Sequence, residues 1–313
     1  MKMINLNNRI QPLLVFLLIT VHSGYGQDIL FKVIASSGKC TLQHGSSAKW
    51  ENLKTGEQLT AGDKVKLNES DYLGLMNSRG KSVELKNPGT YEINELAKNA
   101  LNTGSDLERF AGYVLKESLV SKKKSENMST LGAVVRIRPG IIDIFFPQLT
   151  SVLNESLELK WYPSSPGDRY VFELFNEQNR TVFITETGDT SVTLDLDKFQ
   201  LLPDVKYKWM VYNSKNPDSY SDTCCFVIYP EKRRRAIEDT LNILKNELDN
   251  NSAVDQLMLA GFYTQEDLII DAAGVFEKIL TLVPGVEEYI NYYVTFLLKY
   301  GITHRAEILL KTN

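Results

Sequence analysis

Residues 230–249 read PEKRRRAIEDTLNILKNELD, and here the hydrophobic pattern of this 313-residue chain changes. Pro230 suits the first turn of a helix, because that position needs no backbone N–H. Beyond it, apolar side chains recur at the spacing that places them on one helix face: Ile237, Leu241, Leu244 and Leu248. The stretch predicts a helix, and helical spacing continues to the C-terminus, so we expect a helical domain over residues 230–313.

Upstream of Pro230 the pattern predicts strands. Residues 27–97 contain short alternating runs such as Ile29–Val33, separated by Gly and Pro turn signals. Residues 98–130 interrupt them with a helical segment and a polar linker. Residues 131–229 return to alternation, with about seven strands, the number in an immunoglobulin-like sandwich. The expected fold is therefore multidomain: an all-β N-terminal domain, a β-sandwich and a C-terminal α-helical region.

Two tryptophans and three cysteines bear on the predicted cores. Trp161 and Trp209 lie on strands of the predicted sandwich, and we expect both in its core. Cys224 and Cys225 are adjacent on a strand, so their side chains point to opposite faces and at least one is expected to be buried. A disulfide bond from one of them to Cys40 would join two domains and stays open. An odd and low number of cysteines argues against a framework of disulfide bonds.

The N-terminus has the layout of a secretory signal peptide over residues 1–26. A short apolar run, Leu13–Val21, is followed by small residues at Gly24 and Gly26, and it is preceded by two basic residues, Lys2 and Arg9. A membrane anchor is the alternative, but a span needs about 20 apolar residues. We therefore predict cleavage after Gly26, export to the periplasm or cell surface of a Gram-negative bacterium, and no membrane-spanning segment after cleavage.

The residues offer little catalytic chemistry. Beyond the predicted signal peptide the histidines are His44 and His304, in different predicted domains and outside any recognisable nucleophile motif. Paired cysteines with metal-ligand spacing and Gly-rich phosphate loops are both absent from the sequence. Asp195 and Asp197 share a strand face, which suits calcium or glycoside hydrolysis, but acids are common at turns. We expect no catalytic, cofactor-binding or metal site and no cofactor.

Charge narrows the class of partner. The formal net charge is −4, which gives no nucleic-acid footprint. The densest basic run is Lys232–Arg235, and it either grips an acidic polymer or is solvated with some pairing to Glu238 and Asp239. Export makes nucleic acid an unexpected partner, so we favour the solvated interpretation.

Three segments resemble known families. The run from Trp50 to Asp63, Trp-x-x-Leu-x-x-Gly-x-x-Leu-x-x-Gly-Asp, resembles the periplasmic β domain of FecR-type proteins. In that family the domain relays a signal to a sigma factor, through a membrane helix and a cytoplasmic segment that precede it. Here the predicted signal peptide stands in their place, so the resemblance implies the fold and leaves a signalling role as an alternative. The Trp161 strand and the run Tyr207–Val211 are similar to fibronectin type III-like modules.

The C-terminal region resembles tetratricopeptide repeats. Tyr263, Ala272 and Phe276 recur 34 positions later as Leu297, Ala306 and Leu310, and 34 residues is the period of this helix–turn–helix repeat. The first helices of such repeats line a concave face that holds peptide segments. The resemblance implies five lining residues that would contact a partner: Gln256, Phe262, Tyr263, Asn291 and Thr295.

These observations predict a non-catalytic interaction or scaffold protein of the bacterial cell envelope. Its partner would be an envelope protein or peptide segment, or a surface polymer. Two alternatives stay open: an envelope-sensing regulatory component that uses the FecR-like domain, and a hydrolase acting on surface glycan through an acid pair.

Overall fold

The computed structural model describes residues 28–98, 107–108, 110–112, 114–115 and 140–312. The predicted signal peptide and most of the predicted helical segment and linker at 98–130 lie outside the described residues. The part of that segment that is described is helical and contributes four buried side chains: Leu107, Phe110, Ala111 and Val114.

The N-terminal β domain contains eight strands and one short helix. They form two four-stranded sheets with the orders β4-β1-β6-β7 and β3-β2-β5-β8. At Gly38 φ is +87°, and a Cβ atom would lie 1.9 Å from Oδ1 of Asp71, so this turn requires glycine. The bounds are β1 Ile29–Ser37, β2 Thr41–Gln43, β3 Glu51–Asn52, β4 Gln58–Thr60, β5 Lys64–Leu67, β6 Tyr72–Met76, β7 Ser82–Leu85, β8 Gly89–Glu92 and α1 Ile93–Lys98.

Strand β6 is buried on both faces, and it joins the N-terminal β domain to the rest of the molecule. Leu73 and Leu75 pack in the domain's own core. Tyr72 and Met76, on the opposite face, belong to the core formed by the C-terminal helices. Because side chains alternate between the faces of a strand, the sheet β4-β1-β6-β7 has one face in each core.

The second β domain is a sandwich of a five-stranded sheet, β12-β11-β14-β15-β9, and a two-stranded sheet, β10-β13. Strand β9 is parallel to β15, and the other pairs are antiparallel. The bounds are β9 Leu149–Val152, β10 Ser156–Lys160, β11 Tyr170–Phe175, β12 Thr181–Thr187, β13 Ser191–Asp195, β14 Lys206–Asn213 and β15 Cys224–Ile228. Trp161 and Trp209 are buried between the sheets, as predicted. Cys224 is also buried, and all three cysteines are free thiols, so no bridge to Cys40 forms.

Five helices complete the chain. The first begins directly after Pro230 and buries Ile237, Leu241 and Leu244, as the opening stretch of sequence predicts. Left-handed residues end three of the later segments: Asp267 (φ +53°), Gly285 (φ +76°) and Gly301 (φ +79°). The bounds are α4 Glu231–Glu247, α5 Ala253–Gln265, α6 Ile269–Leu282, α7 Glu287–Lys299 and α8 Thr303–Thr312.

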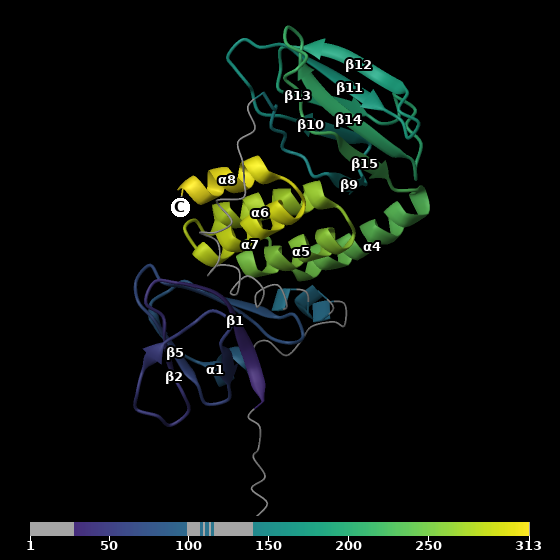
Figure 1. The fold of residues 1–313 in the computed structure, drawn as a ribbon. Coiled ribbons are helices and arrows are strands. Elements are labelled where there is room, and N and C mark those ends of the chain that lie inside the picture. Colours follow the sequence, from purple (N-terminus) through teal and green to yellow (C-terminus); the bar gives the residue numbers. More distant parts are fainter. Residues whose placement is uncertain (1–27, 99–106, 109, 113, 116–139, 313) are drawn as a thin grey trace, which may run out of the picture.

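The helices lie between the two β domains (Figure 1). One continuous core contains side chains of all five helices, of β1 and β6, of the segment 107–114, and Leu153 beside β9. The order of β regions followed by helices confirms the coarse multidomain expectation. Among the described helices, none combines the length and hydrophobicity needed to cross a membrane.

Candidate interaction surfaces

The two histidines in the described part of the chain each lie beside one aspartate. Nδ1 of His44 lies 3.3 Å from Oδ1 of Asp63, and Asp63 also accepts hydrogen bonds from the backbone of Thr60 and Gly45 in a turn. Nδ1 of His304 lies 2.9 Å from Oδ2 of Asp143. Within the described residues there is no cluster of three or more His, Cys, Asp or Glu side chains that could hold a metal ion.

The acid pair considered for glycan hydrolysis also lies at a turn. Asp195 ends β13, and its Oδ1 accepts a hydrogen bond of 2.9 Å from the backbone N–H of Lys198. Asp195 and Asp197 are both exposed, with buried Leu196 between them. Their geometry is that of solvated turn acids.

The five predicted lining residues lie in different environments. Gln256 and Phe262 are each 2% exposed, so neither can contact a partner in this arrangement. The ring of Phe262 packs edge-on against Phe110, with centroids 5.3 Å apart. The remaining three are half-buried on α5 and α7: Tyr263, Asn291 and Thr295. The groove that the repeat pattern predicted to be open is closed at Gln256 and Phe262 by the chain itself.

The N-terminal β domain covers the face of α5 and α7. The hydroxyls of Tyr72 on β6 and Tyr289 on α7 lie 2.8 Å apart and are buried. Tyr292 donates a hydrogen bond of 2.7 Å to the carbonyl of Ile34. Ile34 lies where the β1–β6 register shifts between Val33 and Ala35. Irregularities of this kind disrupt the ladder locally, and Tyr292 donates its hydrogen bond to a backbone carbonyl at this point.

Acidic side chains make further polar contacts from both sides of this interface. Glu84 on β7 accepts hydrogen bonds from Ser252 Oγ (3.1 Å) and from the backbone N–H of Val254 (2.9 Å). The first N–H groups of a helix lack intrahelical acceptors, so a side chain of the N-terminal β domain caps α5. Asp255 accepts a hydrogen bond from the hydroxyl of Ser82. Burial raises the pKa of Asp255 above its usual value.

Glu288, in the first turn of α7, makes the corresponding contact with β1. It accepts hydrogen bonds from the hydroxyl of Thr55 and from the backbone N–H of Ser36 (3.4 Å). Burial raises its pKa as well. Two carboxylates of this interface, Asp255 and Glu288, are therefore hydrogen-bonded while desolvation disfavours their charged form.

The second β domain caps another helix. Leu268, at the N-cap of α6, provides no side-chain hydrogen bond. Thr150 on β9 replaces it: its Oγ1 accepts a hydrogen bond of 3.0 Å from the N–H of Ile269 and donates one of 3.2 Å to the carbonyl of Asp267. Ser151 donates its N–H to the same carbonyl at 2.8 Å. Glu84 thus adds to the cap that Ser252 already gives α5, whereas Thr150 supplies the cap that α6 lacks.

The basic run forms its ion pairs within the helical region. The predicted pairing of Lys232–Arg235 with Glu238 and Asp239 is wrong. Arg235 Nε lies 2.6 Å from Glu231, one turn earlier on α4, and Arg233 pairs with Glu266 at the end of α5. Glu266 lies next to the α5–α6 turn. The position of this turn relative to α4 depends on tertiary packing, which the spacing of residues along α4 cannot predict.

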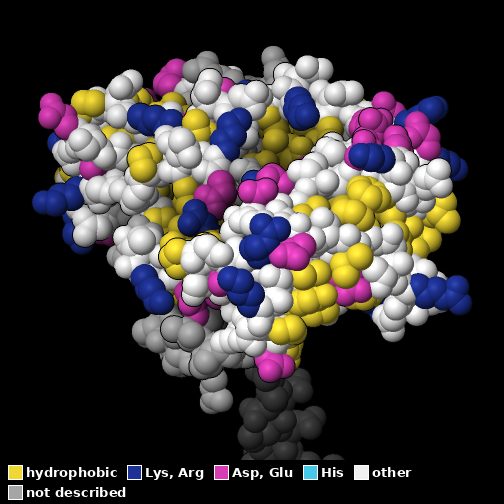
Figure 2. All heavy atoms as spheres, turned by 90° about the horizontal axis from the view of Figure 1, so that it is seen from above, with side chains coloured by type: hydrophobic (Ala, Val, Ile, Leu, Met, Phe, Trp, Pro, Cys, Tyr) yellow, Lys and Arg dark blue, Asp and Glu magenta, His cyan; other side chains and the backbone are white. Residues whose placement is uncertain are grey.

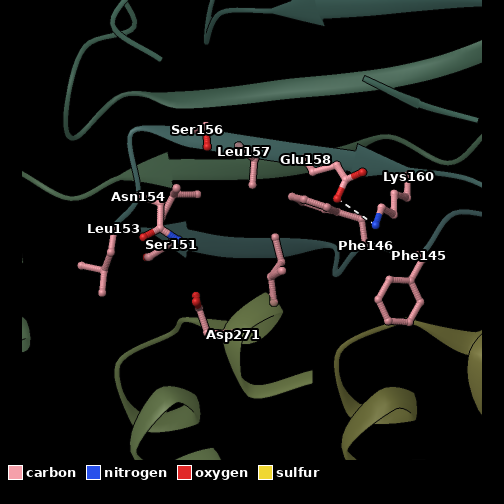
Figure 3. Close-up of a pocket in the computed structure, with 12 residues that line it drawn as sticks. Phe145, Phe146, Ser151, Leu153, Asn154, Ser156, Leu157, Glu158, Lys160 and Asp271 are labelled. Carbon is pink, nitrogen blue, oxygen red and sulfur yellow. Dashed lines mark ion pairs between the residues drawn. The ribbon is translucent and has the colours of Figure 1, made fainter. Parts of the chain in front are cut away.

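A cleft of about 190 Å³ lies between the sandwich and α6 (Figure 3). Leu157 on β10 and Asp271 on α6 point into it from opposite sides. Glu158 and Lys160 form an ion pair of 2.8 Å at its edge. Apolar side chains provide much of the remaining lining: Phe145, Phe146, Val152, Leu153 and Ile270.

Sequence reasoning missed the carboxylates at these contacts. Asp255 and Asp271 each occur in an otherwise apolar helical stretch, and that isolation was the available signal. Glu288 was attributable to the favourable field at a helix start, which explains its position but not its contacts. Its partners, Ser36 and Thr55, lie more than 200 residues away in the sequence.

No known protein-family model matches the chain. Among solved structures, 74% of the chain is similar to 47% of an Astrotactin-2 chain, with 14% sequence identity and a TM-score of 0.20. That protein is described as a conserved, vertebrate-specific, perforin-like membrane protein involved in neuronal development. At this TM-score the likeness carries no conclusion about fold or function.

Proposed function

We propose that this chain is an exported, non-catalytic interaction or scaffold protein of the bacterial cell envelope. It would combine a FecR-like β domain, a fibronectin type III-like sandwich and a helical domain similar to tetratricopeptide repeats. The observation that carries this proposal is the capping of helices by both β domains, in which Glu84 caps α5 and Thr150 caps α6. Domains held in this way form a pre-organised frame, and pre-organisation lowers the cost of binding a partner.

The partner would be an envelope protein or peptide segment, or a surface polymer, and it would contact surfaces that this frame leaves exposed. The sandwich carries several exposed apolar side chains: Leu149, Val182, Ile184, Leu202 and Tyr220. Seen from the sandwich end, hydrophobic side chains gather along one side of the molecule, with charged residues interspersed (Figure 2). Apolar patches rimmed by polar residues are typical of interaction surfaces. We therefore place the primary contact on the sandwich and not on the helices.

Site-specific photo-crosslinking of the full-length protein in intact cells tests this proposal. A photoreactive residue at Ile184 or Leu202 is expected to capture one recurring envelope protein or polymer. The same residue at Asn291 or Thr295, where the side chain is half-buried, is expected to give no such adduct. Capture from the helical positions alone would return the binding site to the helices. Failure to capture an envelope component from any of the four positions would contradict the scaffold proposal.

Export has its own test in the N-terminus of the protein recovered from cells. Cleavage after Gly26 gives a chain that begins at Gln27. N-terminal sequencing of the cell-associated protein is expected to find that residue. A chain that still begins at Met1 would contradict export.

An envelope-sensing role is the second candidate, and the acidic interface is the observation that favours it. Because burial raises the pKa of two of its carboxylates, the contact between the N-terminal β domain and the helices is sensitive to pH. A Gly74→Ala variant, which places a methyl group in this interface, should then alter transcription of envelope genes at unchanged protein abundance. Unaltered transcription would contradict the sensing role, and the scaffold role would then be the one candidate that remains.

A further inference from the structure

The cleft beneath the sandwich is small for a cofactor and large for an empty packing defect. Its volume of about 190 Å³ lies below the roughly 300–1,000 Å³ of typical ligand pockets. Interior voids larger than a water molecule are few in close-packed proteins. A cavity of this size suits one extended side chain or a small aliphatic molecule.

The lining combines apolar surface with two carboxylates, and one of these, Glu158, is ion-paired with Lys160 at the edge of the cleft. Phe145 and Phe146 lie on one side of the cleft, and Leu157 and Ile270 provide further apolar contacts. Asp271 points into this lining from the first turn of α6 (Figure 3). An aliphatic chain could therefore lie along the apolar walls while one of its ends reaches the carboxylate.

The carboxylate of Asp271 is short of partners. Burial raises its pKa, its own backbone N–H provides a hydrogen bond, and Lys245 acts on it only through its field. In the part of the chain that the structure describes, no other side chain forms a hydrogen bond or ion pair with it. Its place in the first turn of α6 favours negative charge. A desolvated charge of this kind is stabilised strongly by a cation brought into contact with it.

We propose that this cleft binds a primary alkylammonium group, with the aliphatic chain against Phe145, Leu157 and Ile270 and the cation on Asp271. A chain of about four methylene groups, as in a lysine side chain, combines these two properties. An anionic ligand would be repelled, and a neutral alkyl ligand would desolvate Asp271 further without compensating it. The group can belong to a free amine or to a lysine of a partner segment. This site is independent of the export and scaffold roles.

Isothermal titration calorimetry of the full-length protein with n-pentylamine and with pentan-1-ol tests the cation requirement. Pentylamine is expected to bind saturably, and pentanol at least about tenfold more weakly. Asp271→Asn should abolish the difference, whereas Glu155→Gln, which removes an exposed charge of the sandwich outside the cleft lining, should retain it. Equal binding of both ligands, an unchanged preference in Asp271→Asn, or no saturable binding of pentylamine would each overturn the proposal.

A measurement on the wild-type protein covers the case in which Asp271→Asn fails to fold. The carboxyl ¹³C shift of Asp271 can be titrated with pH in the presence of either ligand. The neighbouring ionisable groups are Lys245 and Tyr263, with Glu158 and Lys160 at the edge of the cleft. Saturation with pentylamine should lower the pKa of Asp271, and pentanol should not. A pKa that is unchanged by saturating pentylamine would place the amine elsewhere and refute the site.

The source of the amine is distinguished by a third ligand, the capped tripeptide acetyl-Gly-Lys-Gly-amide. Competition of this peptide with pentylamine would support a lysine of a partner segment as the natural ligand. Binding of pentylamine without competition by the peptide would support a free amine. A capped tripeptide with norleucine in place of lysine should compete in neither case, and competition by it would contradict the role of the cation.

Discussion

Tyr292→Phe removes one hydroxyl from the interface between the N-terminal β domain and the helices. The side chain is 6% exposed, and its hydroxyl donates to the carbonyl of Ile34 at 2.7 Å. The phenylalanine ring retains the packing against Tyr289, whose centroid lies 6.1 Å away. The substitution therefore isolates the hydrogen bond from the burial of the ring.

The expected cost follows from the position of the carbonyl. The substitution removes a buried hydrogen bond from the carbonyl of Ile34, and loss of the partner of a buried acceptor costs about 1–3 kcal/mol. One to two kcal/mol changes the ratio of open to closed states by about 5–30-fold. Amide hydrogen exchange of peptides covering β1 should accelerate by a factor in this range, because exchange reports local opening.

Tyr91→Phe is the matched control. Tyr91 donates the same kind of bond, of 2.9 Å to the carbonyl of Asn87, at an exposed site of the same domain, and surface changes usually stay within about 0.5 kcal/mol. If Tyr292→Phe accelerates exchange of β1 no more than Tyr91→Phe does, then the contact does not hold the domain on the helices and the argument for the interface fails.

Three further substitutions test the same arrangement. In Gly74→Ala the new methyl group would lie 2.8 Å from Val254 Cγ2 and 3.1 Å from Tyr289 Oη, so urea unfolding should show that the free energy of unfolding falls by about 1–3 kcal/mol. The control Gly274→Ala, with open space around the new methyl group in α6, should raise it by about 0.5–1 kcal/mol. Similar effects of the two substitutions would refute the close approach at Gly74. Thr150→Val removes the cap on Ile269 and should lower the free energy of unfolding by about 0.5–2 kcal/mol. The control Thr193→Val, on the exposed face of β13, should leave it nearly unchanged. Equal losses of stability would show that the cap contributes nothing. For Glu288, burial raises the folded-state pKa above its ordinary 4.5, so its contribution to stability is fully present below that value and is lost as pH rises through the folded pKa. Stability measured by urea unfolding should therefore fall more between about pH 5 and pH 8 in the wild type than in Glu288→Gln. The exposed control Glu69→Gln should behave like the wild type. An identical fall in all three proteins would contradict the raised pKa of Glu288.

The sequence predicts elements better than it predicts which faces meet. Alternation places Trp161 and Trp209 correctly in the sandwich core, and apolar spacing after Pro230 places α4. Both signals are local, because a strand or helix face depends on side chains a few residues apart. The order of β regions and helices follows from such signals alone.

The contacts between domains required information that local patterns lack. Strand β6 has five buried residues in succession, and α5 is buried on nearly all sides. Continuous apolar runs of this kind indicate that both faces are covered, so burial of Gln256 and Phe262 could have been suspected. The partners that cover them could not, because Phe262 packs against Phe110, which lies far away in the sequence.

The cleft shows the same limit. Asp271 is visible in the sequence as an acid in an apolar helix start, a common and favourable position. Its burial depends on β9 and β10 packing over α6, which no periodicity in the helix reveals. The cleft exists only where residues of the sandwich and of α6 pack together in the folded chain.

Two backbone amides test the central claim, that the β domains hold the helices between them, most directly. The N–H groups of Val254 and Ile269 lie in the first turns of α5 and α6 and donate to Glu84 and Thr150 of the β domains. Residue-resolved hydrogen exchange of the full-length protein by nuclear magnetic resonance is expected to find both amides strongly protected, as in a buried strand. Exchange of either amide at the rate of a solvent-exposed helix start would contradict the account, because that β domain would not be holding its helix in solution.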